Sequence, residues 1–491
     1  MSTGTMQLAE RVLVLATALQ RELDGTAHRG AADRIVERLS GPLRVAIAGR
    51  VKAGKSTLLN ALVGERLAPT DAGECTRLVS WYRHGPSYEV AAQLRSGVRR
   101  NLPFTRADGE LAIELGGVAE RDVASLDIRW PSAALQDVTL IDTPGLASVN
   151  DENSRRTRDF LEHDEAAPTD ADAVIYLMRH LHRSDVAFLD AFMDRSVTAA
   201  SPVNAVAVLS RADEIGAGRP DAMVSSRRIA DRYRNDPAVT RLVADVVPVT
   251  GLLAETGLTL VESEAAALRI LASTPDDVLD RMLLSADELC DLHASDLTVD
   301  LRRQLLGRLG MFGIRVAIHE IRQGATTAAQ LGPRLVEHSG LADLRRVIAE
   351  HFLPRARVLQ ARSAIAAVRS LSRTVARDEP HLAARIDRDA EQLEAGAVEF
   401  GQIRAAHLVA SGLVQVDERE RLDLQRLLLA GPTPKALGLD ASVGSDTLRA
   451  AALDTVERWR ARAQDPFADP RLIEVAETAA RIGESLYAAA S

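Results

Sequence analysis

The octapeptide Gly49–Ser56, with the sequence GRVKAGKS, is the feature that most constrains this chain. It fits the pattern G-x-x-x-x-G-K-[ST], follows an apolar run at 43–48 and precedes a helix-like run at 57–62. In that context the glycines let the backbone wrap a phosphate, and the N–H groups at the start of the helix face the anion. The sequence therefore predicts a phosphate-binding P-loop whose contacts come from Gly49, Arg50, Val51, Lys52, Ala53, Gly54, Lys55, Ser56 and Thr57.

Composition narrows the class of protein. A chain of 491 residues is longer than one ordinary core, so two or three domains are expected. Aromatic residues make up only 3%, which favours long helices over β-sandwiches. The formal net charge of −9 argues against nucleic acid as a partner, because such proteins usually carry a basic excess. Cys75 and Cys290 form no metal-binding spacing and suggest a reducing compartment.

Hydrophobic patterning divides the chain into three regions. Residues 6–39 carry one apolar stripe at helical spacing, interrupted at Asp24-Gly25. Short β-branched runs then alternate with helical patterns, which is typical of a mainly parallel sheet covered by helices on both faces. These strands are expected at 43–48, 79–83, 136–141, 173–178, 203–209 and 245–249, with antiparallel strands at the sheet edge within 86–130. From 252 onward the pattern is helical.

The N-terminal helical stripe has no apolar partner nearby, so we expect it to pack on the C-terminal helices. The predicted fold class is thus α/β, with a P-loop domain inserted into an α-helical bundle. Its expected divisions are helices of the bundle at 1–40, the P-loop domain at 41–353 and a C-terminal bundle or stalk at 354–491. No segment approaches the roughly 20 apolar residues that a membrane span needs, so any membrane contact is expected to be peripheral.

Three side chains are candidates for a magnesium site. Ser56 belongs to the P-loop, and Asp142 ends a strand and opens the tetrapeptide Asp142–Gly145 (DTPG). A carboxylate there can hold Mg²⁺ through water, and the Gly145 N–H can sense a γ-phosphate. Thr76 lies in the loop between the P-loop helix and the next strand, where a hydroxyl can close over Mg²⁺. Taken alone, Thr76 is equally well an ordinary loop threonine.

Two further loops predict recognition of a guanine base. Ser210-Arg211-Ala212-Asp213 follows a predicted strand, and the Asp213 carboxylate can accept both N1–H and N2–H₂ of guanine. Arg211 stands where such motifs usually place a lysine, but its planar guanidinium can still stack on the base. Thr250-Gly251 follows the last predicted strand, where backbone N–H groups would meet guanine O6.

These signals occur in the order and spacing of a GTPase, with a long interval between Ser56 and Asp142. With the flanking helices they resemble the bacterial dynamin-like proteins. Within them the chain is most similar to the isoniazid-inducible dynamin-like proteins of mycobacteria, in particular the shorter of two paralogues. Segments 308–314 and 339–341 also resemble sequences of that group. The resemblance implies GTP hydrolysis with Mg²⁺, nucleotide-dependent self-association or co-assembly with a paralogue, and peripheral cytoplasmic work on anionic lipid at the inner face of the plasma membrane.

The P-loop departs from the family pattern at two positions. Val51 stands where eukaryotic dynamins have a glutamine, and Lys52 where they have a serine that helps hold a catalytic cation. Lys52 therefore has two interpretations: a built-in cation for the transition state, or a solvated lysine near the phosphates. The expected catalytic residues are Lys52, Lys55 and Thr76. The departures also leave open a weakly active paralogue that co-assembles with an active relative, or a regulatory switch that binds a protein partner.

A membrane-contacting tip has two alternatives. If residues 354–400 form one kinked helix at about 1.5 Å per residue, it extends about 70 Å and ends near 396–401. That segment, GAVEFG, carries two larger apolar residues that can dip into a leaflet. The alternative is a buried turn between helices, with the loop at 435–439 as the next candidate tip.

Overall fold

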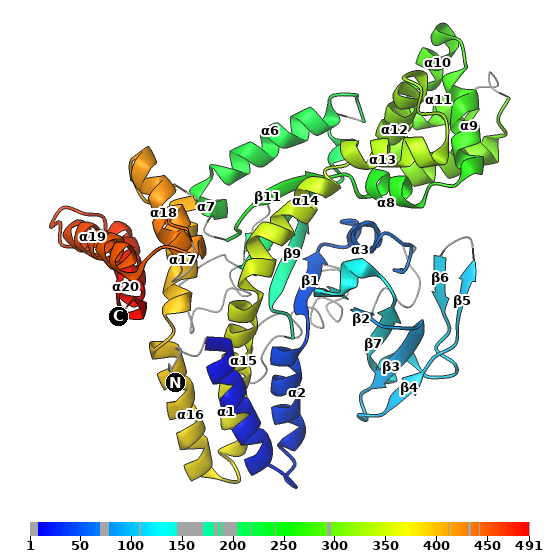
Figure 1. Cartoon of the computed structure of the whole chain (residues 1–491). Coiled ribbons are helices and arrows are strands. Elements are labelled where there is room, and N and C mark those ends of the chain that lie inside the picture. Colours follow the sequence, from blue (N-terminus) through cyan, green and yellow to red (C-terminus); the bar gives the residue numbers. More distant parts are fainter. Residues whose placement is uncertain are drawn as a thin grey trace.

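The computed structural model describes residues 8–68, 78–107, 110–144, 170–180, 185–186, 189, 204–216, 218–240, 242–291, 296–410, 412–430, 434–440 and 442–490. A twisted sheet occupies the centre, flanked by groups of helices (Figure 1). In the view of Figure 1, one group of helices lies below the sheet, a second lies to its left and a third lies at the upper right. This arrangement confirms the predicted α/β class with a large additional helical region.

The main sheet has nine described strands in the order β11-β10-β9-β1-β8-β2-β7-β3-β4. The five strands from β11 to β8 are mutually parallel, while β2 runs antiparallel to β8 and parallel to β7. The edge strands β3 and β4 add in antiparallel fashion, as expected for 86–130. The bounds are β1 Leu43–Gly49, β2 Val79–His84, β3 Glu89–Leu94, β4 Arg99–Asn101, β7 Val123–Trp130, β8 Val138–Asp142, β9 Ala173–Met178, β10 Ala205–Ser210 and β11 Val246–Val249. Strands β5 Phe104–Ala107 and β6 Glu110–Ile113 form a separate hairpin.

Both faces of the central strands are buried, which explains their continuous apolar sequence. In β1, Val45 and Ile47 face one cluster of apolar side chains, and Ala46 and Ala48 face the other. The first face is covered by α3 Lys55–Val63, α14 Leu341–Val347, η6 Ile348–Phe352 and η7 Leu353–Arg355. The second is covered by α6 Ala222–Arg234 and α7 Pro237–Thr240. The parallel strands therefore end at one edge, where loops can gather into a site.

A separate apolar cluster supports the helices that follow β11. These are α8 Gly251–Thr259, α9 Glu262–Ala272, α10 Asp276–Met282, α11 Ala286–Asp291, α12 Val299–Arg322 and α13 Ala328–His338. They form the body at the upper right of Figure 1. Helix α12 is broken at Gly310, whose φ of 63° and ψ of 175° are not helical.

Helices from both ends of the chain pack together, as predicted. The helices α1 Leu8–Glu22 and α2 Arg29–Ser40 share one apolar cluster with α15 Ala356–Val375 and α16 Pro380–Ala395. Leu8, Val12, Ala16 and Leu19 are the buried side chains of α1, and they lie against this group. The α/β segment is thus inserted between helices that meet in space.

The single kinked helix proposed for 354–400 is wrong. Helix α15 ends at Val375, and Pro380 is the first residue of α16, which folds back antiparallel along α15. Proline suits this position because its missing N–H and fixed φ are tolerated in the first helical turn. Phe400 is only 7% exposed and belongs to the same cluster as α1, so 396–401 is the buried turn and not the tip.

The remaining C-terminal helices form a separate body with its own apolar core. They are α17 Val398–Ala410, α18 Glu418–Ala430, η8 Pro434–Leu437, α19 Ser445–Ala463 and α20 Pro470–Ala489, in the region expected to be helical. Three further short helical turns are η2 Glu120–Asp122, η3 Ala133–Leu135 and η5 Ala212–Glu214. Across the described helices, none is at once long and apolar enough to traverse a bilayer.

Candidate functional site

The P-loop lies at the carboxyl end of β1 and leads into α3, as the sequence predicts. Gly49 has a φ of 148°, and a Cβ atom at this position would lie 2.5 Å from the carbonyl oxygen of Leu177. Gly54, with a φ of 91°, caps the start of α3. Both positions therefore need glycine, because an L side chain would be strained or would clash. Lys52 adopts a left-handed φ of 62° without being glycine and is exposed at the crest of the loop.

Lys55, Ser56 and Asp142 meet at the start of α3. The Lys55 Nζ atom donates to the carbonyl oxygens of Gly49 and Arg50, each at 3.4 Å, so it curls over the loop. The Ser56 hydroxyl donates to Asp142 Oδ2 at 3.1 Å. Burial lowers the pKa of Lys55 and raises the pKa of Asp142, and each charge partly offsets the other's shift.

The predicted base-binding residues share a cavity with the P-loop. This cavity, of about 110 Å³, is lined by Ala53, Gly54 and Thr57 on one side and by Arg211, Asp213 and Gly251 on the other. The carboxyl ends of β9, β10 and β11 bring these segments together. Asp213 is buried, and its burial raises the pKa of its carboxyl. Arg211 has a left-handed φ of 52°, and its guanidinium donates to Glu214 at 2.5 Å.

Two segments that sequence reasoning left without a role support this cavity. In the turn Ser339–Leu341, the Ser339 carbonyl accepts from the Thr250 N–H at 2.9 Å. Gly340 has a φ of 78°, and a Cβ there would lie 2.2 Å from the Pro248 carbonyl oxygen, so only glycine lets the turn approach β11. This turn therefore fixes the backbone of the predicted base loop.

The break in α12 provides the second support. A Cβ atom at Gly310 would lie 3.5 Å from Asp213 Oδ2, so the broken helix passes directly beside that carboxylate. Phe312, two residues on, is buried in the α8–α13 core. In the sequence, segment 308–314 is distinguished only by its resemblance, and spacing alone does not reveal the partner of Gly310.

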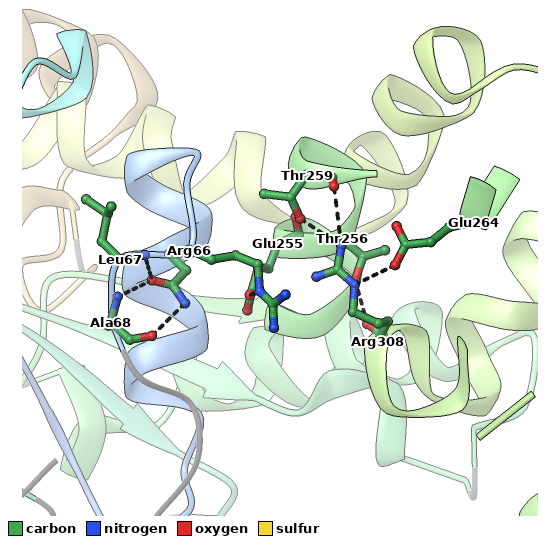
Figure 2. Close-up of polar contacts among 9 residues, drawn as sticks. Arg66, Leu67, Ala68, Glu255, Thr256, Thr259, Glu264 and Arg308 are labelled. Atoms are coloured by element: carbon green, nitrogen blue, oxygen red, sulfur yellow. Dashed lines mark hydrogen bonds and ion pairs between the residues drawn. The ribbon is translucent and has the colours of Figure 1, made fainter. Parts of the chain in front are cut away.

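A polar network connects the end of the P-loop helix to these outer helices (Figure 2). It begins at Asn60, which is buried in α3. Its Oδ1 accepts from the backbone N–H groups of Leu67 at 2.9 Å and Ala68 at 2.7 Å, and its Nδ2 donates to the Ala68 carbonyl at 3.0 Å. One side chain thus satisfies three backbone groups of the segment that leads toward Thr76.

The network continues through two arginine–glutamate pairs. Arg66 donates to buried Glu255 of α8 at 3.1 Å. Arg308 of α12 donates to Glu264 of α9 at 3.0 Å and to the Thr259 hydroxyl at 2.9 Å (Figure 2). Burial raises the pKa of Glu255, and the charges of Arg66 and Arg308 counteract that rise. These pairs therefore join the segment after α3 to α8, and α12 to α8 and α9, with Arg308 two residues before the break at Gly310.

The donor set fits a magnesium ion. The Asp142 Oδ1 atom is buried and accepts no hydrogen bond from any residue that the structure describes, although it lies beside the Ser56 hydroxyl. Hard oxygen donors of this kind suit Mg²⁺, which is usually held by one or two protein oxygens, waters and phosphates. A dedicated cluster of three or more His, Cys, Asp or Glu side chains is absent from the described part of the chain.

The structure brings most of the predicted residues together and leaves two unplaced. Thr76 and Gly145 lie outside the described residues. The P-loop residues, Asp142, Arg211, Asp213, Thr250 and Gly251 all lie at one edge of the sheet. Within that set, Arg50, Val51 and Lys52 are exposed on the outside of the loop, whereas Ala53 and Asp213 are buried.

Comparison with known proteins extends these observations. The model of the dynamin family matches residues 45–196, which contain the P-loop and Asp142. The isoniazid-induced protein IniC of Mycobacterium tuberculosis is 40% identical over 461 residues, covering 93% of this chain and 92% of that protein. A bacterial dynamin-like protein of Nostoc punctiforme is 32% identical over 126 residues, which is 23% of this chain and 18% of that protein.

Among solved structures, an oligomerised bacterial dynamin pair is similar over 98% of this chain and 79% of its own, with 13% identity and a TM-score of 0.31. The extended match to the mycobacterial protein decides the family, because it spans the helical regions as well as the sheet. Dynamin-family proteins are GTPases that bind guanine nucleotides and self-assemble. The chain belongs to this family, with the mycobacterial isoniazid-induced IniC proteins among its relatives.

Proposed function

We propose that the chain hydrolyses GTP to GDP and phosphate. Lys55 contacts the β- and γ-phosphates, the P-loop N–H groups surround them, and Asp213 pairs with the guanine edge. Ser56 and Asp142 hold Mg²⁺, with Thr76 completing the site and the Gly145 N–H sensing the γ-phosphate. When bound, Mg²⁺ offsets the negative charge on the β- and γ-phosphates. Lys52 extends the positive charge of the loop.

One observation carries this proposal: the P-loop and Asp213 line the same cavity, with Ser56 and Asp142 beside it. A nucleotide whose phosphates lie against the N–H groups of the loop would therefore direct its base toward Asp213. Adenine lacks the pair of donors that this carboxylate accepts, and a site built for such donors discriminates by large factors. The geometry thus supports guanine over adenine as the preferred base.

The test is nucleotide binding and turnover by the full chain. Wild type should bind GTP more tightly than ATP in calorimetry, and Asp213→Asn should reduce that preference. Lys55→Ala should lose tight binding and hydrolysis while its circular dichroism spectrum stays unchanged. Near-normal turnover in Lys55→Ala, or equal affinity for ATP and GTP in wild type, would show that the proposed roles are wrong.

We further propose that this activity is coupled to self-association, or to co-assembly with a paralogue, and to peripheral contact with anionic lipid at the inner face of the plasma membrane. Phe467 supports a membrane contact, because it is 96% exposed between α19 and α20. The nearby arginines of α19 are ion-paired within the chain, Arg458 with Asp423, Arg460 with Glu484 and Arg462 with Glu420, so the exposed ring alone supports the membrane contact. A fully exposed aromatic ring suits an interfacial position.

Phe467→Asp should therefore weaken co-sedimentation with anionic liposomes several-fold, with an unchanged melting temperature. Leu284→Asp is the matched control, because Leu284 is 75% exposed but belongs to the α8–α13 body. Equal liposome binding by both variants would place the contact elsewhere. A GTP analogue should increase sedimentation of wild type if assembly accompanies binding, and analytical ultracentrifugation without lipid separates assembly from membrane attachment.

A further inference from the structure

A second cavity, of about 240 Å³, lies between the helical bundle and the sheet. Helices α2 and α15 run side by side below β1 (Figure 1). The residues that line the cavity come from these two helices, from Arg44 near the amino end of β1 and from Asp170. Its polar lining consists of Arg34, Arg38, Arg44, Asp170, Ser370 and Thr374. The volume is many times the roughly 10–15 Å³ that one water molecule needs. This cavity is remote from the P-loop, which lies at the other end of β1.

Positive charge predominates in this cavity. Three arginines and one aspartate line it, and Arg44 is buried with 8% exposure. The Arg44 guanidinium lies over the Trp81 ring, 5.4 Å from its centroid, and forms no hydrogen bond or ion pair with the described residues. The Arg44 backbone is engaged on both sides: the N–H donates to Asp172 Oδ2 at 3.0 Å, and the carbonyl accepts from the Asp172 N–H at 2.8 Å. A buried guanidinium normally satisfies its five N–H donors.

Two carboxylates, Asp170 and Asp172, offset part of the charge of the three arginines. The Arg38 side chain is 4% exposed, forms ion pairs with Asp170 and buried Asp172 at 3.7 Å each, and donates to the Ser363 carbonyl at 3.3 Å. Asp170 itself is 54% exposed, so solvent screens its charge. Burial, followed by the nearness of Arg38, lowers the pKa of Arg44. Arg38 and Arg44 thus repel each other in a partly desolvated space.

We propose that this cavity binds a phosphate group, either free phosphate or a phosphate ester, at a site distinct from the nucleotide site. Guanidinium groups bind phosphate through paired, charge-assisted hydrogen bonds, which would satisfy the unengaged donors of Arg44. The exposed Arg34 and Thr374 leave the cavity open to solvent between α2 and α15, which provides an entry route.

The bound anion connects the two parts of the molecule. Arg34 and Arg38 belong to α2, whereas Arg44 belongs to β1. A phosphate held by all three would link the bundle to the sheet and resist any relative movement of the two. Ligand binding to the folded state alone raises stability by mass action. The structure therefore assigns to phosphate the role of a stabilising link at this junction.

The experiment uses the full chain carrying Lys55→Ala, so that the P-loop does not contribute phosphate binding. Inorganic phosphate is titrated into this protein by calorimetry, and melting temperatures are measured in phosphate and in chloride at equal ionic strength. Binding should weaken at least tenfold in Arg44→Met and should be unchanged in Arg377→Met, an exposed arginine on the turn after α15. Arg34→Met, at the exposed end of the cavity, tests the same site if Arg44→Met fails to fold.

A second arm distinguishes the source of the phosphate. Vesicles of phosphatidylcholine with phosphatidic acid should bind in an Arg44-dependent manner if the natural ligand is a lipid headgroup, and should be indifferent to Arg44 if it is a soluble ester. In phosphate-free buffer, Arg44→Met should melt at or above the temperature of the parent, because an uncompensated buried charge is removed. Equal phosphate affinity in Arg44→Met, Arg34→Met and Arg377→Met, with no Arg44-dependent vesicle binding, would overturn the proposal. That result would leave the nucleotide-site roles untouched.

Discussion

At the scale of single residues, Lys52 is the most consequential difference from the dynamin pattern. Its left-handed backbone places an exposed ammonium group at the crest of the P-loop. If that group stabilises charge that develops only during hydrolysis, Lys52→Ala should lower kcat at least tenfold with little change in the dissociation constant of GTP. Single-turnover hydrolysis and equilibrium titration measure the two quantities separately.

Exchange of K⁺ for Na⁺ is the control for this prediction. With Lys52 supplying the charge, turnover should be the same in both salts, since no monovalent cation is needed at that position. A parallel loss of binding and rate in Lys52→Ala, or a strong requirement for K⁺, would instead identify Lys52 as a solvated side chain. Lys52→Arg should retain part of the rate in the first case.

At the scale of elements, Asn60 controls how α3 is joined to the segment after it. Asn60→Ala would leave two backbone N–H groups and one carbonyl without their partner in a buried place. Such losses cost about 2–3 kcal/mol in the free energy of unfolding. Urea denaturation should show this loss, and GTP turnover should fall more than GTP affinity because the segment leads to Thr76. Asn60→Asp, which keeps the acceptor oxygen, should recover part of the stability.

The elements also show where sequence patterns are informative. Strands such as β9 match their predicted range because both faces are buried, which produces an unbroken apolar run. The turn at Pro380 was misjudged for a physical reason: proline ends one helix and equally well begins another, and only packing against α1 decides that α16 folds back. The P-loop, Asp142 and Asp213 could be found from local motifs. The contacts of Gly310 and Gly340 could not, since each depends on a partner 90 or more residues away.

At the scale of the whole molecule, the C-terminal helices contact the sheet region through a histidine. His407 of α17 is half-buried near Thr240, His351 and Arg355, and the desolvation of its ring, reinforced by the two neighbouring basic groups, lowers its pKa to about 4. The neutral form is therefore favoured in the folded protein. Stability from this group is complete above the ordinary histidine pKa of about 6.5 and is lost as pH falls toward 4.

This shift predicts an acid-sensitive junction. Lowering the pH from 7.5 to 5 should cost about 2 kcal/mol of unfolding free energy through His407 alone. His407→Gln cannot be protonated, so its denaturation midpoint should depend less on pH over that range. Chemical denaturation of both proteins at several pH values makes the measurement, and equal pH dependence in the two would rule out His407 as the sensitive group. We propose that the chain divides into the N-terminal helices of the bundle at 1–40, the P-loop domain at 41–353 and the C-terminal helices at 354–491.

The union of α1 and α2 with α15 and α16 has a consequence for how the chain is made. About 315 residues separate the end of α2 from the start of α15. At about 5–20 residues per second of synthesis, the apolar stripe of α1 waits roughly 15–60 s for its partner helices. The nascent protein thus carries an unsatisfied hydrophobic surface while its nucleotide domain is being translated. Closure of the bundle therefore becomes a late event in biogenesis.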